Sequence, residues 1–150
     1  MSWFLVLKTL HILSAIVAVG ANVTYAVWSL RGRAEPEHLG FALRGVKFID
    51  DRVANPAYGV LLVTGLIMAF TQYTIGTRWI LTGLGLYIIL AVTAVVRYSP
   101  TLGRQVALVE AGRADSDEYR AADARARGVG MFLGVLLVVA VVVMVFKPTF

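Results

Sequence analysis

Long apolar stretches, separated by two charged segments, dominate the pattern of this chain. Four stretches contain no Asp, Glu, Lys or Arg: residues 9–30, 53–77, 79–96 and 128–146. Each is close to the roughly 20 residues with which a helix crosses the hydrocarbon core of a bilayer. Because lipid offers the backbone no hydrogen-bond partners, such segments are expected to be helical. The pattern predicts an all-α polytopic membrane protein, a single domain (residues 1–150) forming an antiparallel four-helix transmembrane bundle with spans at about 3–30, 53–72, 78–97 and 127–147.

Composition narrows the class of protein further. Hydrophobic residues make up 59% of the chain and charged residues 15%, against about 45–50% and 25% in an ordinary soluble domain. A chain of this kind cannot cover itself with polar surface, which excludes a soluble monomer. It contains no cysteine and only two histidines, so we predict no disulfide, no thiolate or multi-histidine metal site and no cysteine nucleophile.

The basic residues predict the orientation of the spans. Eleven of the 14 Lys and Arg residues lie in the segments between spans one and two and between spans three and four. The positive-inside rule then places both segments in the cytoplasm and both termini outside. The net charge of +5 therefore reflects membrane topology and contact with anionic lipid headgroups at the inner face. It does not indicate a nucleic-acid partner.

Both charged segments are expected to carry cytoplasmic helical extensions. An amphipathic stretch at 38–51 leads into the second span, where Asn55-Pro56 predicts a kink or a helix restart. The segment 97–127 contains a short helix ending at Gly112 and a second helix capped by Ser116 or Asp115. Its alternating charges are typical of a solvated face.

The carboxylates have a one-sided distribution. All nine lie in the two charged segments, which leaves no Asp or Glu within a predicted span. This argues against transporters that relay protons through buried carboxylates. Asp50 and Asp51 point to different faces of a helix, and we expect them to pair with Arg44, Lys47 or Arg52.

The first span carries a seam of polar and small side chains. Because lipid offers these side chains no partners, the seam should face the bundle interior or a cavity. Its candidate binding residues are His11, with Lys8, Asn22 and Tyr25 on the same face. The full seam, at alternating spacings of three and four, is Lys8, His11, Ala15, Ala18, Asn22, Tyr25 and Ser29.

Three roles remain open for His11. It could form a hydrogen bond to a Thr, Tyr or Gln of a neighbouring helix, serve as an axial ligand of haem b, or handle protons or contact a substrate. The second histidine, His38, lies on the opposite side of the membrane and cannot complete a bis-histidine site with it. A haem would need His11 alone, a ligand such as Lys8, or a second copy of the chain.

Several short motifs are similar to those of known families. The stretch 7–15, LKTLHILSA, followed by Gly20, resembles the first helix of a family of small bacterial integral membrane proteins of unknown function. Residues 64–66, TGL, and 77–80, TRWI, are also similar to that family's pattern. The resemblance covers nearly the whole chain, and it implies four spans in a bacterial inner membrane.

A more distant resemblance connects the first helix to HemJ-type protoporphyrinogen oxidases and copper-resistance D-type proteins. The HemJ-type resemblance implies a haem ligand at His11, although spans two to four of this chain contain no histidine. We expect a non-catalytic structural, accessory or complex-subunit role, with a second copy or a larger membrane complex as partner. No residue is predicted to be catalytic. The alternatives are a haem-b-associated redox protein using His11 and an oligomeric small-solute carrier or channel.

Overall fold

The computed structural model describes residues 2–74 and 76–148, and within them the chain folds as four long helical rods. Four helices are long and apolar enough to cross a membrane, as the apolar stretches predicted. Two of the rods are divided into segments. The elements are α1 (Trp3–Ala34), η1 (Pro36–His38), α2 (Leu39–Ile49), η2 (Asp50–Ala54), α3 (Asn55–Thr71), α4 (Arg78–Thr93), η3 (Ala94–Tyr98), α5 (Ser99–Glu110) and α6 (Asp117–Phe146).

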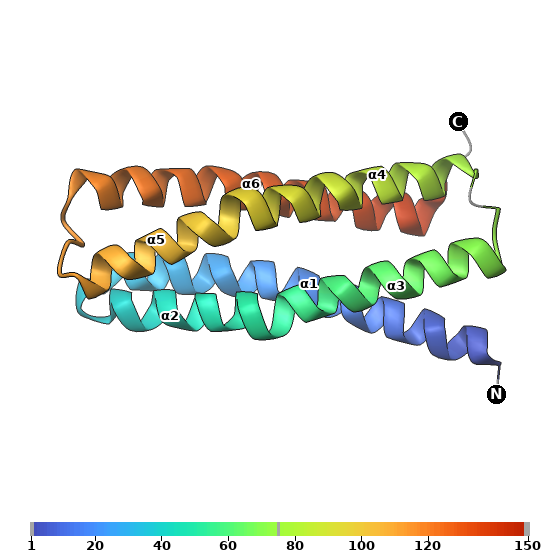
Figure 1. Cartoon of the computed structure of the whole chain (residues 1–150), viewed down its shortest axis with the longest axis horizontal. Coiled ribbons are helices and arrows are strands. Elements are labelled where there is room, and N and C mark those ends of the chain that lie inside the picture. The colour runs from blue at the N-terminus through green and yellow to red at the C-terminus, as the bar shows by residue number, and fades with distance from the viewer. Residues whose placement is uncertain (1, 75, 149–150) are drawn as a thin grey trace.

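The rods form an antiparallel bundle of two helical hairpins (Figure 1). In the first hairpin α1 packs against α2 and α3, and in the second α6 packs against α4 and α5. The hairpins meet through α2 with α5 and through α1 with α6. Both termini and the α3–α4 turn lie at one end, and the α1–α2 and α5–α6 connections lie at the other (Figure 1).

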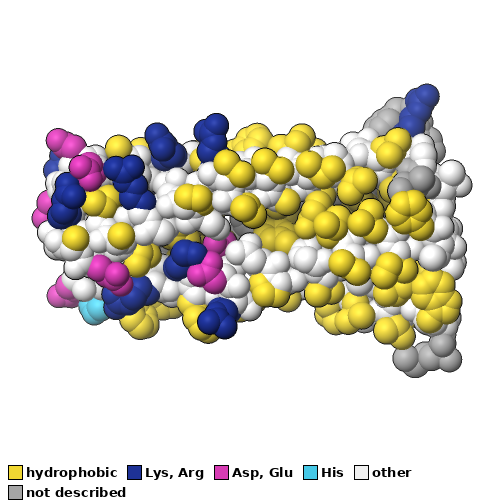
Figure 2. All heavy atoms as spheres, viewed as in Figure 1, with side chains coloured by type: hydrophobic (Ala, Val, Ile, Leu, Met, Phe, Trp, Pro, Cys, Tyr) yellow, Lys and Arg dark blue, Asp and Glu magenta, His cyan; other side chains and the backbone are white. Residues whose placement is uncertain are grey.

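The bundle has an apolar half and a charged half. Figure 2 shows acidic and basic side chains gathered over the end that carries the α1–α2 and α5–α6 connections, and apolar side chains over the other half. Many large apolar side chains of the second half are exposed, including Phe70, Met131 and Val145 at about 70%. Such a surface is compatible with lipid and not with water. The expected helical extensions are therefore the charged halves of the same four rods.

The second and third rods each contain a π-helical turn where a proline follows. η2 ends directly before Asn55-Pro56, and η3 ends directly before Ser99-Pro100. Proline lacks the backbone N–H and crowds the carbonyl four residues earlier, and a widened turn relieves both problems. At Pro56 the chain therefore neither restarts nor breaks, and at Pro100 the predicted short helix continues the third span through a π turn.

The two connections at the charged end follow their local sequence. Gly112 has a φ of +70°, which ends α5 in the left-handed region that glycine tolerates best. The Ser116 hydroxyl accepts a hydrogen bond of 3.1 Å from the Tyr119 backbone N–H and caps α6. Of the two predicted caps, Ser116 is confirmed. At the other connection, Gly32 lets α1 and α2 approach closely, because a Cβ there would stand 2.9 Å from the Cβ of Ala42.

Candidate functional site

Polar side chains on the inner side of α1 form a series of contacts from the apolar half to the charged half of the bundle. We call this series the polar column. Its members on α1 are His11, Asn22, Tyr25 and Arg33, and each contacts a residue on another rod. Lys8, which the seam also included, is exposed and lies outside the column.

His11 contacts α3 at the end of the column that lies in the apolar half. Its Nδ1 lies 3.1 Å from the hydroxyl oxygen of Thr64. The ring rests on Gly65, where a Cβ would stand 2.9 Å from Cε1 and 4.0 Å from Nε2. The contact with Thr64 is the kind of hydrogen bond to a neighbouring helix that was one of the three predicted roles of His11. A ligand role through Nε2 stays a prediction.

Asn22 and Tyr58 together connect three rods, close to Tyr25. The Asn22 side-chain amide donates to the Tyr58 hydroxyl at 3.0 Å and to the Ala18 carbonyl at 3.0 Å. The Tyr87 hydroxyl, from α4, donates to the Tyr58 backbone carbonyl at 2.9 Å. These bonds connect the first hairpin to the second where apolar packing offers no directional preference.

Asp50 lies at the centre of the bundle, where the two halves meet. It is only 4% exposed. One carboxylate oxygen accepts a hydrogen bond from the Tyr25 hydroxyl at 3.3 Å, and the other accepts one from the Ser99 hydroxyl at 2.5 Å. The Tyr25 ring stacks on Tyr98, with 5.8 Å between centroids. Asp50 opens η2, whereas Tyr98 closes η3 and Ser99 follows it, so both π turns contribute to this contact.

The expected pairing of the two adjacent aspartates was right for one and wrong for the other. Asp51 is exposed and pairs with Lys47 at 2.5 Å, one turn earlier on the same helix. Asp50 faces inward and pairs with none of Arg44, Lys47 and Arg52; its partners among the described residues are hydroxyls. The reason is tertiary: Asp50 occupies the buried face of its helix, where Tyr25 and Ser99 meet it from other rods.

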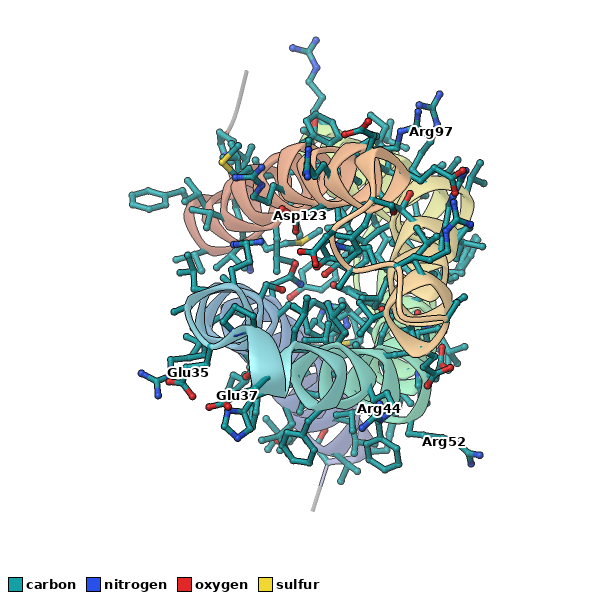
Figure 3. All side chains as sticks on the ribbon, turned by 90° about the vertical axis from the view of Figure 1, so that its left-hand side faces the viewer. Glu35, Glu37, Arg44, Arg52, Arg97 and Asp123 are labelled. Carbon is teal, nitrogen blue, oxygen red and sulfur yellow. The ribbon has the colours of Figure 1, made fainter. Side chains whose placement is uncertain are left out.

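A second buried carboxylate, Asp123, lies in the charged half. Its Oδ1 accepts from Arg33 at 3.0 Å and from the Gln105 amide at 3.2 Å, and Arg127 lies 3.3 Å from Oδ2. Figure 3, which looks along the bundle from the charged end, shows Asp123 between the rods. The description of segment 97–127 as a solvated face is therefore wrong for Asp123, because α6 turns this residue towards α1 and α5. Next to it, burial raises the pKa of the Tyr119 hydroxyl, and the Asp123 carboxylate raises it further.

Sequence reasoning missed most partners of the column. Tyr58, Tyr87 and Ser99 lie on three different elements, and no local spacing relates them to α1. The sequence contained one usable signal, a polar residue directly before a proline at Asn55-Pro56 and at Ser99-Pro100. In the structure a π turn ends just before each of these pairs. Proline releases a backbone group from its usual helical bond, so polar side chains beside it often have a structural role.

The contacts of the polar column favour a structural role, in which the column holds helices together, over a chemical one. Most of its side-chain hydrogen bonds join different rods. Among the described residues, no group of three or more His, Asp or Glu side chains could hold a metal ion. Asp50 differs from the other members of the column, because it is a buried carboxylate whose described partners carry no positive charge.

One of three comparisons with known proteins identifies a family, and that family agrees with this architecture. No curated protein matches the chain, and no solved structure matches it either. The likeness to HemJ-type and copper-resistance D-type proteins stays a prediction. The model of one family matches residues 5–148, which is nearly the whole chain. The protein is therefore a member of the integral membrane protein family described as "Predicted integral membrane protein (DUF2269)".

Proposed function

We propose that this protein is a non-catalytic accessory component of its membrane, which acts through its outer surface as part of a homo-oligomer or a larger membrane complex. The observation that carries the proposal is the polar column. His11, Asn22 and Tyr25, the candidate binding residues of the seam, are occupied by Thr64, Tyr58 and Asp50 of the same chain. Side chains that are committed to holding rods together leave the exposed surface as the place of interaction.

The experiment measures the mass of the assembled protein and tests for bound haem. The tagged chain, extracted from its native membranes in a mild detergent, should run at a mass well above that of one 16.3 kDa copy. Mass spectrometry of the assembly then shows whether the partner is a second copy or another chain. Protein produced with haem supplied should be colourless. A Soret band that disappears in His11→Ala would instead establish the haem-b alternative, and a monomer in native membranes would refute the accessory role.

A second candidate function is favoured by one observation. Asp50 is buried beside hydroxyls alone, and an ionised carboxylate in such a place is costly without a counter-charge. A small monovalent cation bound at Asp50 would supply the missing counter-charge. Vesicles loaded with a sodium-sensitive dye provide the test. If Asp50 carries the cation, sodium flux should fall to the level of empty vesicles in Asp50→Asn, while the neighbouring Asp51→Asn should leave it unchanged.

The orientation of the bundle is a separate part of the proposal. We place the charged half in the cytoplasm and both termini on the outer side of a bacterial inner membrane, because eleven of the 14 basic residues lie in that half. The chain has no cysteine, so single-cysteine variants report position directly. In intact cells a membrane-impermeant maleimide should label Thr77→Cys and should label Gly112→Cys only after lysis. The reverse pattern would invert the topology.

A further inference from the structure

A shallow groove lies between the third rod and α6, where the charged half begins. Its end nearest the apolar half encloses about 190 Å³ and is lined by Val96, Arg97, Pro100, Thr101, Arg104 and Arg125. The groove continues along α5 and α6 past Glu118 and Ala122. It lies on the outside of the bundle and shares no residue with the polar column.

The charge of the groove is strongly positive. Arg97, Arg104 and Arg125 line it, and Glu118 is the one carboxylate among its lining residues. Glu118 is held by Arg113 at 3.1 Å and lies 3.8 Å from Arg104. Within residues 2–74 and 76–148, neither Arg97 nor Arg125 forms an ion pair. Two guanidinium groups therefore remain available to an external anion, and Figure 3 shows Arg97 pointing away from the bundle.

The groove is continuous with the apolar surface. Val96 lines it, and Val92, Val95 and Val96 are each more than half exposed on the side of the third rod. Arg97 is the first charged residue after this apolar stretch. An amphiphile whose chains lie along these valines would therefore place its headgroup at the arginines.

We infer that this groove binds the phosphate headgroup of one anionic phospholipid from the leaflet on the charged side, with Arg97, Arg104 and Arg125 as its ligands. Guanidinium groups donate paired hydrogen bonds to phosphate and lose less hydration than ammonium groups do. Basic pockets between membrane helices are a recognised geometry for anionic headgroups. Unlike general attraction to a basic surface, this site has a defined place. It also goes beyond the accessory role, because one copy can bind a lipid with or without a protein partner.

The test measures lipid binding to the full chain in detergent micelles. Native mass spectrometry follows titration with phosphatidylglycerol and, separately, with phosphatidylcholine. We expect saturable binding of about one phosphatidylglycerol per chain and none of phosphatidylcholine at the same concentration. In Arg97→Gln/Arg104→Gln/Arg125→Gln the affinity should fall about 100-fold, since each basic side chain near a membrane surface contributes roughly fivefold.

A matched triple variant removes the same charge elsewhere. Arg31→Gln/Arg44→Gln/Arg52→Gln alters exposed arginines of the first hairpin and should change the affinity less than threefold. An equal loss in both triple variants would overturn the site in favour of diffuse attraction. Displacement of the lipid by millimolar inorganic phosphate would show a site for a soluble anion and would equally overturn the inference. If the groove triple variant does not fold, Arg97→Gln and Arg125→Gln alone should each weaken binding about fivefold.

Discussion

Replacing Asp123 by alanine is expected to lower the free energy of unfolding by about 3–5 kcal/mol, the usual cost of removing one partner from a buried ion pair. The substitution leaves the Arg33 guanidinium and the Gln105 amide without their shared acceptor. Because these residues come from α1 and α5, the loss separates three rods in the charged half at once. Unfolding by SDS in mixed micelles, followed by far-ultraviolet circular dichroism, measures the change.

The same helix offers the control. Asp117 also pairs with an arginine, Arg120 at 3.0 Å, but its side chain is 97% exposed. Exposed ion pairs contribute about 0–1 kcal/mol, so Asp117→Ala should have a small effect. Equal losses for the two variants would show that Asp123 does not hold the bundle together and would contradict a structural role for the end of the column that lies in the charged half.

Replacing Gly32 by leucine is the second change with a large expected effect, a loss of about 3 kcal/mol from overpacking. Gly32 lies where α1 turns back along α2. A Cβ at this position would stand 2.9 Å from the Cβ of Ala42 and 3.5 Å from the backbone Cα of Leu39. Neither atom can move without shifting α2, so a larger side chain must open the first hairpin.

Alanine substitutions give a matched comparison for this position. Gly32→Ala should destabilise the protein, because its Cβ already makes the short contact with Ala42. At Gly45, also within a helix, a Cβ would meet nothing within 4 Å. Gly45→Ala should therefore stabilise the protein by about 0.5–1 kcal/mol through helix propensity. Shifts of the same sign at both glycines, measured in the same SDS titration, would contradict the close helix approach at Gly32.

Both predictions concern contacts between rods that local sequence patterns could not supply. The seam at spacings of three and four identified the face of α1 that carries His11, Asn22 and Tyr25, since helical periodicity is a local property. The same reasoning assigned Asp50 to nearby basic residues, because those are the neighbours a single helix provides. Its actual contacts, Tyr25 and Ser99, lie 25 and 49 residues away along the chain.

The groove shows the same division between sequence and structure. The sequence places eleven basic residues in the charged half and indicates anionic lipid as their partner. It cannot tell which of them lie together, because Arg97 and Arg125 belong to different rods. Their meeting depends on the packing of α5 against α6.

The sequence by itself determined the helical class, the four apolar stretches and the concentration of charge in the segments that join them. These follow from the free energy of placing each residue in lipid or water, which is a property of the residue and its near neighbours along the chain. Only the tertiary structure decided that Asp50 and Asp123 are buried, that two prolines are accommodated by π turns, and that His11 meets Thr64. Those outcomes depend on which faces of separate rods come together, and that choice is made by packing and by pairing buried polar groups across the whole bundle.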